Sequence, residues 1–263
     1  MGGHAEAMLS RTDDSVRLLG LDRDPEALRR AGERLAPFAD RVRLAQASFR
    51  DVTEIAREHG VDSARAIVLD LGVSSYQLDE SGRGFTFQAE DQPLDMRMEP
   101  GAGEPAAALL NRLPEAELAR ILFEYGEEIH ARRIAREIVR RRPLATTGDL
   151  VAAVRRAVPR TAWPRRMHVA TKTFQAVRMA VNDETGALRH ALPLAAALLE
   201  TGARLGVISF HSGEDRIVKQ TFRSLSAASY AELEPSPLTP GDDEVRANAR
   251  ARSAKLRVLE RLP

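Results

Sequence analysis

The chain is 263 residues long, with 43% hydrophobic and 29% charged residues, a balance that excludes a protein that is disordered throughout. It contains no apolar run of about 18 residues and no basic segment followed by an apolar one at its start. We therefore expect neither a membrane span nor a secretory signal, and a cytoplasmic location. There is no cysteine, and the six histidines lack the spacing of metal ligands, so we predict no metal site.

The net charge of +1 conceals an uneven distribution. Between residues 131 and 172 there are twelve arginine or lysine residues and two acidic ones, a local net charge of +10. Such a segment favours a polyanionic partner, although a solvated, arginine-rich helix surface has the same composition.

The first predicted elements are a glycine turn, a short helix and a strand. Gly2, Gly3 and His4 precede a helix-forming stretch over residues 5–9, and the apolar run 16–22 predicts a strand that ends in Asp22. A helix is predicted over 23–35, because a proline at position 25 suits a first helical turn. The acid that caps this helix is better sought at position 24, immediately before the proline, than at Asp22.

Two further strands are predicted over 41–49 and 65–72, and the second of them contains Asp70. Strands separated by helix-length segments indicate right-handed βαβ units and a parallel sheet. From residue 104 to about 174 the strand pattern stops, and residues 106–126 and 132–142 have helical periodicity. We therefore predict a helical insert, broken at Pro143, Pro159 and Pro164.

The alternation resumes after the insert. A long helix is predicted over 174–200, a strand over 204–210, a helix over 213–224, a proline-rich loop over 234–243 and a closing strand over 255–262. The sequence thus predicts an α/β fold with an inserted all-helical domain, divided into residues 1–103, 104–172 and 173–263.

The predicted ligand lies at the carboxyl ends of the strands. An acid that closes the second strand of such a sheet commonly accepts hydrogen bonds from ribose hydroxyls, and Asp22 has that position. It lies 18 residues after His4, near the spacing of about 20 expected between the glycine turn and the acid of nucleoside-binding folds. NAD and S-adenosylmethionine both present an adenosine ribose, so the cofactor stays open at this point.

The loop after the third predicted strand, "DLGVSSYQLDESGRGFTFQAEDQPLDMRM" (70–98), resembles the signature of the MraW/RsmH family. Further stretches agree in order: "GLDRDPEAL", "EYGEEIHARRIAREIV", "TKTFQAVRMAVNDE", "ISFHSGEDRIVK" and "NARARSAKLRVLER". The resemblance implies a Rossmann-like class I methyltransferase that uses S-adenosylmethionine. It also implies a reaction at the exocyclic N4 of a cytidine in the decoding centre of bacterial 16S rRNA.

The resemblance also assigns cofactor contacts. It implies that Gly2, Gly3 and His4 are the end of a glycine loop, that Asp22 binds the ribose and that Phe49 contacts the adenine, with Asp70 and Gln77 as further neighbours. Taken singly, a phenylalanine at a strand end is more often a core residue, and a glutamine in a loop is a common surface amide.

Asp70 is the predicted catalytic residue. Methyl transfer needs the cytosine amino nitrogen aligned with the methyl group, and acceptors aimed at the amino hydrogens stabilise the charge that develops. Asp70 and the backbone of 71–74 occupy the place where DNA amino-methyltransferases carry such acceptors. The Pro-Pro-aromatic sequence that follows in those enzymes is absent here, so this assignment is an analogy of position.

The RNA is expected to contact aromatic and basic residues. Phe85, Phe87 and Tyr76 are candidates to receive an extruded base, with loop packing as an equal alternative, and His211 is placed to lie beside it. Phosphate contacts are predicted for the basic residues Arg132, Arg133, Arg136, Arg140, Arg141, Arg142, Arg155, Arg156, Arg165, Arg166, Arg252 and Lys255.

Two departures from the family pattern bear on the fold. Gly213 stands where leucine is usual, and the family's first strand and part of its glycine loop are missing before residue 1. Because that strand lies in the middle of the sheet, we expect a break there and a fragment, a mis-started reading or a weakened protein. An RNA-binding protein with weakened catalysis and an NAD-dependent oxidoreductase are the alternatives, and the oligomeric state is open, a homodimer included.

Overall fold

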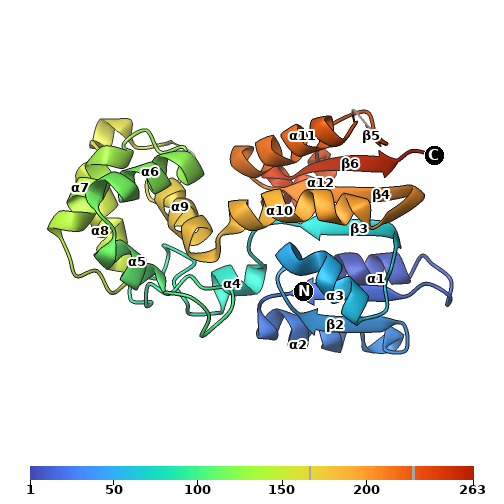
Figure 1. The fold of residues 1–263 in the computed structure, drawn as a ribbon. Helices are drawn as coiled ribbons and strands as arrows, with labels where there is room; N and C mark the ends of the chain where they lie inside the picture. Colours follow the sequence, from blue (N-terminus) through green and yellow to red (C-terminus); the bar gives the residue numbers. More distant parts are fainter. Residues whose placement is uncertain (166, 227–228) are drawn as a thin grey trace. The chain divides into compact units, whose positions relative to one another are not determined.

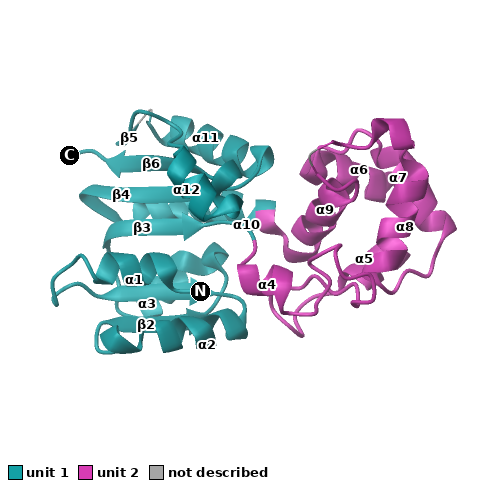
Figure 2. Ribbon diagram, turned by 180° about the vertical axis from the view of Figure 1, so that it is seen from behind, with its two compact units in different colours: residues 1–72, 185–263 teal, residues 73–184 magenta. Residues whose placement is uncertain are grey.

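The computed structural model describes residues 1–165, 167–226 and 229–263. The chain forms two compact units (Figure 2). Unit 1 comprises residues 1–72 and 185–263, and unit 2 comprises residues 73–184. No helix in the described ranges is both long and apolar enough to cross a bilayer.

Every strand in the described residues belongs to unit 1, together with helices α1–α3 and α10–α12 (Figure 1). Its strands are β1 (Leu18–Asp22), β2 (Val42–Gln46), β3 (Ala64–Asp70), β4 (Leu199–Ser209), β5 (Tyr230–Glu232) and β6 (Lys255–Arg261). Its helices are α1 (Gly3–Leu9), α2 (Pro25–Arg34), α3 (Val52–Glu58), α10 (Glu184–Ala197), α11 (Ser212–Ser226) and α12 (Asp242–Ala247). Short 3-10 turns cover 36–38, 49–51 and 249–253.

Local sequence signals account for several of these elements. The Asp24 carboxylate accepts the backbone N–H of Glu26 at 3.1 Å, and Pro25 occupies the first turn, so α2 starts where the sequence predicts. In β4, Leu205 and Val207 alternate with less buried residues and are fully buried, as is Phe222 of α11. The core of this half of unit 1 is therefore built on one strand and the helix that follows it.

The strands form two sheets. In the first, β1 pairs with β2 in parallel, and in the second the order is β3-β4-β6-β5, with β3 and β4 parallel. The closing strand β6 runs antiparallel to both β4 and β5. The predicted parallel pairing is found in β1–β2 and β3–β4, whereas β6, for which no direction was predicted, is antiparallel to both of its neighbours.

The predicted break in the sheet is present. In the part of the chain that the structure describes, β1 pairs only with β2 and β3 only with β4, so each has one edge without a strand partner. Helix α1 is drawn between β3 and the β1–β2 pair (Figure 1). Its Leu9 is buried in a cluster that includes Leu18 of β1 and Val42 of β2.

All named elements of unit 2 are helices, as predicted for the insert. They are α4 (Ser75–Asp79), α5 (Ala106–Arg112), α6 (Glu115–Gly126), α7 (Ala131–Arg140), α8 (Thr147–Ala157) and α9 (Thr171–Asn182), with a 3-10 turn over 160–162. The unit begins earlier than the expected residue 104, because Leu94 and Met96 are fully buried in the same core as the helices.

The single long helix predicted over 174–200 is wrong. Asp183 adopts a left-handed conformation with φ 48°, which ends α9 before α10 begins. Aspartate tolerates this conformation better than most residues, so the break has a local cause that helical periodicity does not reveal.

Candidate active site

Asp22 stands at the carboxyl end of β1, where the sequence places it. Its Oδ1 accepts the backbone N–H of Asp24 at 2.9 Å, which fixes the direction of the carboxylate. Burial raises the pKa of Asp22, and this effect outweighs the hydrogen bond and the positive amino terminus, both of which lower it. A partly desolvated carboxylate in this position is suited to accept hydrogen bonds from ligand hydroxyls.

Asp70 stands at the carboxyl end of β3, and His4 of α1 reaches it. His4 Nε2 lies 3.6 Å from Asp70 Oδ2. Burial raises the pKa of Asp70 and the charge of Glu214 adds to this, whereas His4 and the positive amino terminus lower it. The positive amino terminus thus lowers the pKa of both aspartates, against the effect of burial.

A third carboxylate follows β4 and was not predicted. Glu214 of α11 is 3% exposed; its Oε2 accepts the Phe210 backbone N–H at 2.9 Å, and its Oε1 lies 3.1 Å from His211 Nε2. The sequence did hold a signal for Glu214, an acid just after a strand within "FHSGEDR". His211 is therefore held by Glu214, and its place beside a base stays a prediction.

The glycines at the start of the chain have different surroundings. Gly2 has a φ of 81° and is the residue before α1, a left-handed conformation that side chains rarely adopt. A Cβ on Gly3 would lie 3.2 Å from a guanidinium nitrogen of Arg34. Phe49, the predicted adenine contact, is partly buried against the core of the β3–β4 sheet.

Unit 1 thus carries Asp22 and Asp70 at the carboxyl ends of β1 and β3, with His4 of α1 beside Asp70 and His211 beside Glu214 after β4. These carboxylates can accept hydrogen bonds from ribose hydroxyls and amino groups, and their negative charge suits a cationic ligand. No group of three or more potential metal-ligating side chains occurs within the described ranges.

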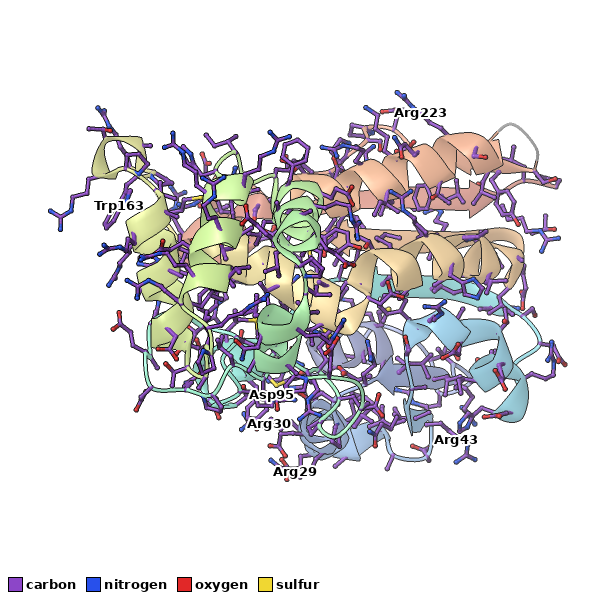
Figure 3. The ribbon with its side chains drawn as sticks, turned by 60° about the vertical axis from the view of Figure 1, so that its left-hand side comes forward. Arg29, Arg30, Arg43, Asp95, Trp163 and Arg223 are labelled. Carbon is purple, nitrogen blue, oxygen red and sulfur yellow. The ribbon has the colours of Figure 1, made fainter. Side chains whose placement is uncertain are left out.

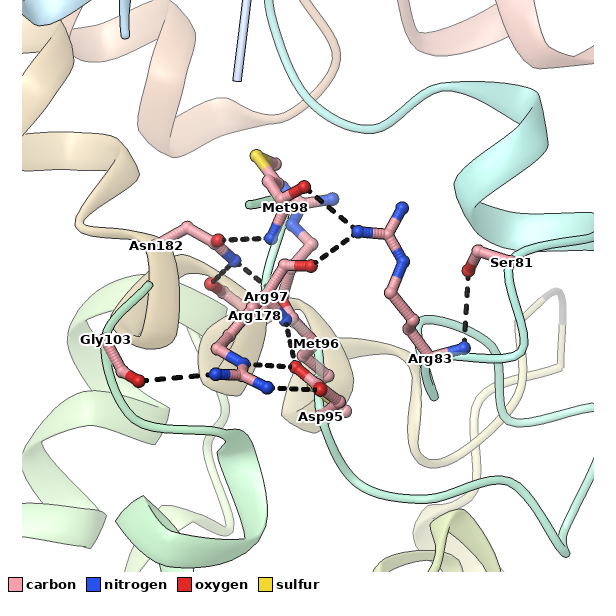
Figure 4. Close-up of polar contacts among 9 residues, drawn as sticks. All are labelled: Ser81, Arg83, Asp95, Met96, Arg97, Met98, Gly103, Arg178 and Asn182. Carbon is pink, nitrogen blue, oxygen red and sulfur yellow. Dashed lines mark hydrogen bonds and ion pairs between the residues drawn. The ribbon is translucent and has the colours of Figure 1, made fainter. Parts of the chain in front are cut away.

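The signature loop belongs to unit 2 and is held by hydrogen bonds (Figure 4). Asn182, at the end of α9, is buried; its Oδ1 accepts the Met98 N–H and its Nδ2 donates to the Met96 carbonyl, both at 2.8 Å. Arg97 makes a two-point contact with Asp95, at 2.7 and 2.8 Å. The sequence analysis did not single out Asn182, because a lone asparagine at a helix end has no distinctive pattern.

Gln77 also lies in this unit. It is buried, and its Oε1 accepts the Ser74 N–H at 2.9 Å while its own N–H donates to Ser74 Oγ, forming a capping box at the start of α4. Its side chain therefore has a structural partner, and its predicted contact with the cofactor stays a prediction.

Comparison with known proteins gives the family. A family model described as the MraW methylase family matches residues 1–262. The chain belongs to the MraW methylase family. It is 47% identical over 281 residues to "Ribosomal RNA small subunit methyltransferase H" of Heliobacterium modesticaldum, covering 99% of this chain and 90% of that protein. It is 49% identical over 280 residues to the protein of the same name from Syntrophotalea carbinolica, covering 99% and 89%.

A solved structure titled as a putative rRNA-methylase from Clostridium thermocellum is also similar, with a TM-score of 0.44 and 10% identity, covering 99% of this chain and 83% of that one. The MraW-family assignment confirms the predicted family and the Rossmann-like methyltransferase class. It also removes the NAD-dependent oxidoreductase from consideration, because the match to a methylase family spans the chain.

The aromatic residues predicted to receive a base in this methylase have partners within unit 2. Phe85 is 6% exposed, in the helical core, with the Arg83 guanidinium over its ring. The Phe87 ring stacks on His168, with centroids 4.5 Å apart, and meets Phe174 edge-on. These contacts are those of loop packing, the alternative to base binding, and the base-receiving role stays a prediction.

The predicted phosphate-binding residues of the methylase fall into three groups. The members of the first have partners within unit 2, and among them Arg136, Arg155 and Arg156 pair with Glu115, Glu90 and Glu137. Arg140 and Arg141 both pair with Glu137, at 2.6 and 2.7 Å, and hydrogen bonding to Arg140 and Arg141 lowers the pKa of Glu137 to about 2. Arg142 donates to the carbonyls of Leu110, at 2.9 Å, and Leu113, so it ties the end of α5.

The second group comprises Arg132 and Arg133, which are exposed on α7 and form no ion pair with the described residues. The third group comprises the remaining predicted residues. Arg165 is exposed beyond Trp163, which is labelled in Figure 3, and Arg166 lies outside the described residues. In unit 1, Arg252 is exposed, whereas Lys255 Nζ lies 3.1 Å from Asp215 Oδ2.

Proposed function

We propose that this chain methylates the exocyclic N4 of a cytidine in the decoding centre of small-subunit ribosomal RNA, with S-adenosylmethionine as the methyl donor. The proposal rests on family membership and on one observation in unit 1. Asp22 and Asp70 close β1 and β3, and His4 of α1 lies 3.6 Å from Asp70. The two relatives compared above are both named ribosomal RNA small subunit methyltransferase H.

The residues present fit the cofactor. Gly2 enters α1 with a left-handed backbone and no side chain, Asp22 offers an oriented carboxylate for ribose hydroxyls, and Asp70 and Glu214 supply negative charge for a cationic ligand. When bound, S-adenosylmethionine supplies an electrophilic methyl group whose C–S bond breaks as the N–C bond forms.

Asp70 is the acceptor proposed for the cytosine amino group. Its carboxylate would accept a hydrogen bond from the amino hydrogens, stabilise the positive charge that grows on nitrogen and take the proton that leaves. His4 orients this carboxylate from the α1 side. The helical unit would supply phosphate contacts through exposed arginines such as Arg132 and Arg133.

The test is transfer of an isotopically labelled methyl group to small-subunit rRNA and to assembled subunits, with the modified nucleotide located by mass spectrometry. We expect label on the N4 of a single cytidine, and a loss of transfer in Asp70→Asn. Label on another base, or on another atom of cytosine, would overturn the assignment of the site.

A second candidate function is RNA binding with weakened methyl transfer. Within the described ranges β1 and β3 each have one edge without a strand partner, which favours it, because an interrupted sheet positions Asp22 and Asp70 less rigidly than a continuous one. Tight binding of rRNA without detectable transfer would select this alternative.

A further inference from the structure

Phe123 and Ile129 are unusually exposed for apolar residues. Their exposed fractions are 62% and 80%, whereas every other large exposed apolar side chain in the described ranges is below half. Phe123 lies in the last turn of α6, and Ile129 lies in the segment that joins α6 to α7 in unit 2 (Figure 1). Scattered exposed apolar residues are normal, but the two most exposed ones, six residues apart, indicate a surface that contacts something.

The segment over residues 123–130 is held by several hydrogen bonds. Glu127 adopts a left-handed conformation with φ 49°, and its N–H donates to the Phe123 carbonyl at 3.0 Å. Lys172 Nζ of α9 donates to the Glu127 carbonyl at 2.9 Å, and Glu128 Oε1 accepts the His130 N–H at 2.9 Å. The exposure of the two side chains is therefore a property of a fixed segment.

Two cations that follow this segment form no ion pair with any acidic residue that the structure describes. Arg132 and Arg133 follow Ile129 by three and four residues, in the first turn of α7, and their side chains are exposed. Neither forms an ion pair with the described residues, in contrast to Arg120 on α6, which lies 2.8 Å from Glu124. Guanidinium groups that lack carboxylate partners are available to phosphates.

We infer that Phe123, Ile129, Arg132 and Arg133 form a contact site for a single-stranded segment of RNA, which we call the α6–α7 site. An unpaired base would stack on the Phe123 ring and pack against Ile129, while the two arginines bind the flanking phosphates. Aromatic faces bind unpaired bases with little sequence preference, and backbone charge adds a salt-dependent contribution. The inference rests on the proposed function, because it takes RNA to be the substrate.

The first experiment measures binding of a twelve-nucleotide oligouridylate, a duplex of the same length and small-subunit rRNA. We expect Phe123→Ser to weaken binding of the single strand about tenfold, the loss typical of one stacked base, with little change for the duplex. Phe123→Tyr should retain wild-type affinity and Phe123→Leu should not, because stacking needs a ring. Leu238→Ser, at an exposed leucine of unit 1, is the matched control.

The second experiment places a photo-crosslinking phenylalanine at position 123. We expect crosslinks to RNA, which the arginine double variant Arg132→Gln, Arg133→Gln should reduce. Crosslinks to a second copy of the chain, with unchanged RNA affinity in Phe123→Ser, would overturn the inference in favour of a protein interface. Equal affinity of the tyrosine and leucine variants would also overturn it. Failure of the proposed function is separate, because wild-type protein would then transfer no methyl group to rRNA while oligouridylate binding could still be measured.

Discussion

The imidazole of His4 lies 3.6 Å from the carboxylate of Asp70, joining the first turn of α1 to the carboxyl end of β3. If Asp70 must be ionised to accept the amino hydrogens, activity falls as the pH drops through its pKa, which burial raises and His4 lowers. His4→Ala removes the lowering influence, so the acid limb of the kcat/KM profile should move to higher pH. The measurement is methyl transfer as a function of pH, and an acid limb that stays in place would show that Asp70 does not titrate in the reaction.

Asp22→Asn should weaken cofactor binding and stabilise the protein without cofactor. Loss of the charged acceptor for the ribose hydroxyls should cost about 1–3 kcal/mol of binding free energy by calorimetry. Because burial raises the pKa of Asp22, the native state binds a proton more tightly than the unfolded state. The free energy of unfolding of the wild type therefore falls as the pH rises through the pKa of Asp22. In Asp22→Asn no carboxyl group titrates at this position, so this fall is absent.

The melting temperature of Asp22→Asn should thus exceed that of the wild type at pH 7, with the difference vanishing below about pH 3, where both carry a neutral side chain. Asp62→Asn, at an exposed position of unit 1, should show no such difference. A lower melting temperature for Asp22→Asn at pH 7 would contradict the desolvation argument.

Replacing Arg132 and Arg133 with glutamine should weaken rRNA binding and reduce its dependence on salt. Each lost phosphate contact removes roughly 0.7–0.9 from the slope of log affinity against log salt concentration, so the double variant should lose about 1.4–1.8. Arg142→Gln is the contrasting variant. It should lower the melting temperature and leave the slope unchanged, because that guanidinium binds the Leu110 carbonyl. Equal slopes in the double variant and the wild type would show that Arg132 and Arg133 are solvated surface residues that bind no phosphate.

Asn182→Ala should destabilise unit 2 by about 2–4 kcal/mol, because it removes the side-chain partner of the Met98 N–H and of the buried Met96 carbonyl. Chemical denaturation followed by circular dichroism measures the loss. Asn182→Asp keeps the acceptor for Met98 and loses both donors, so it should remain well below the wild type. A loss under 1 kcal/mol in the alanine variant would mean that the loop over 95–98 is held by other contacts.

The sequence by itself determined the features that depend on neighbours along the chain. The Asp24 side chain caps α2 and Pro25 supplies a fixed φ in its first turn. The apolar runs over 16–22 and 204–210 contain β1 and the second half of β4, because an apolar run is a signal that neighbouring residues carry. The acids at the ends of β1 and β3 could be placed for the same reason. The family motifs indicated the methylase class, which secondary-structure propensity cannot indicate.

The tertiary structure decided what depends on residues far apart in the chain. The antiparallel direction of β6 depends on its pairing with β4, and the internal use of Arg142 depends on carbonyls about 30 residues earlier. The approach of His4 to Asp70 joins residues 66 positions apart. Periodicity records which face of an element is buried, whereas hydrogen bonds between distant segments follow from how those faces pack, and only the folded chain fixes that.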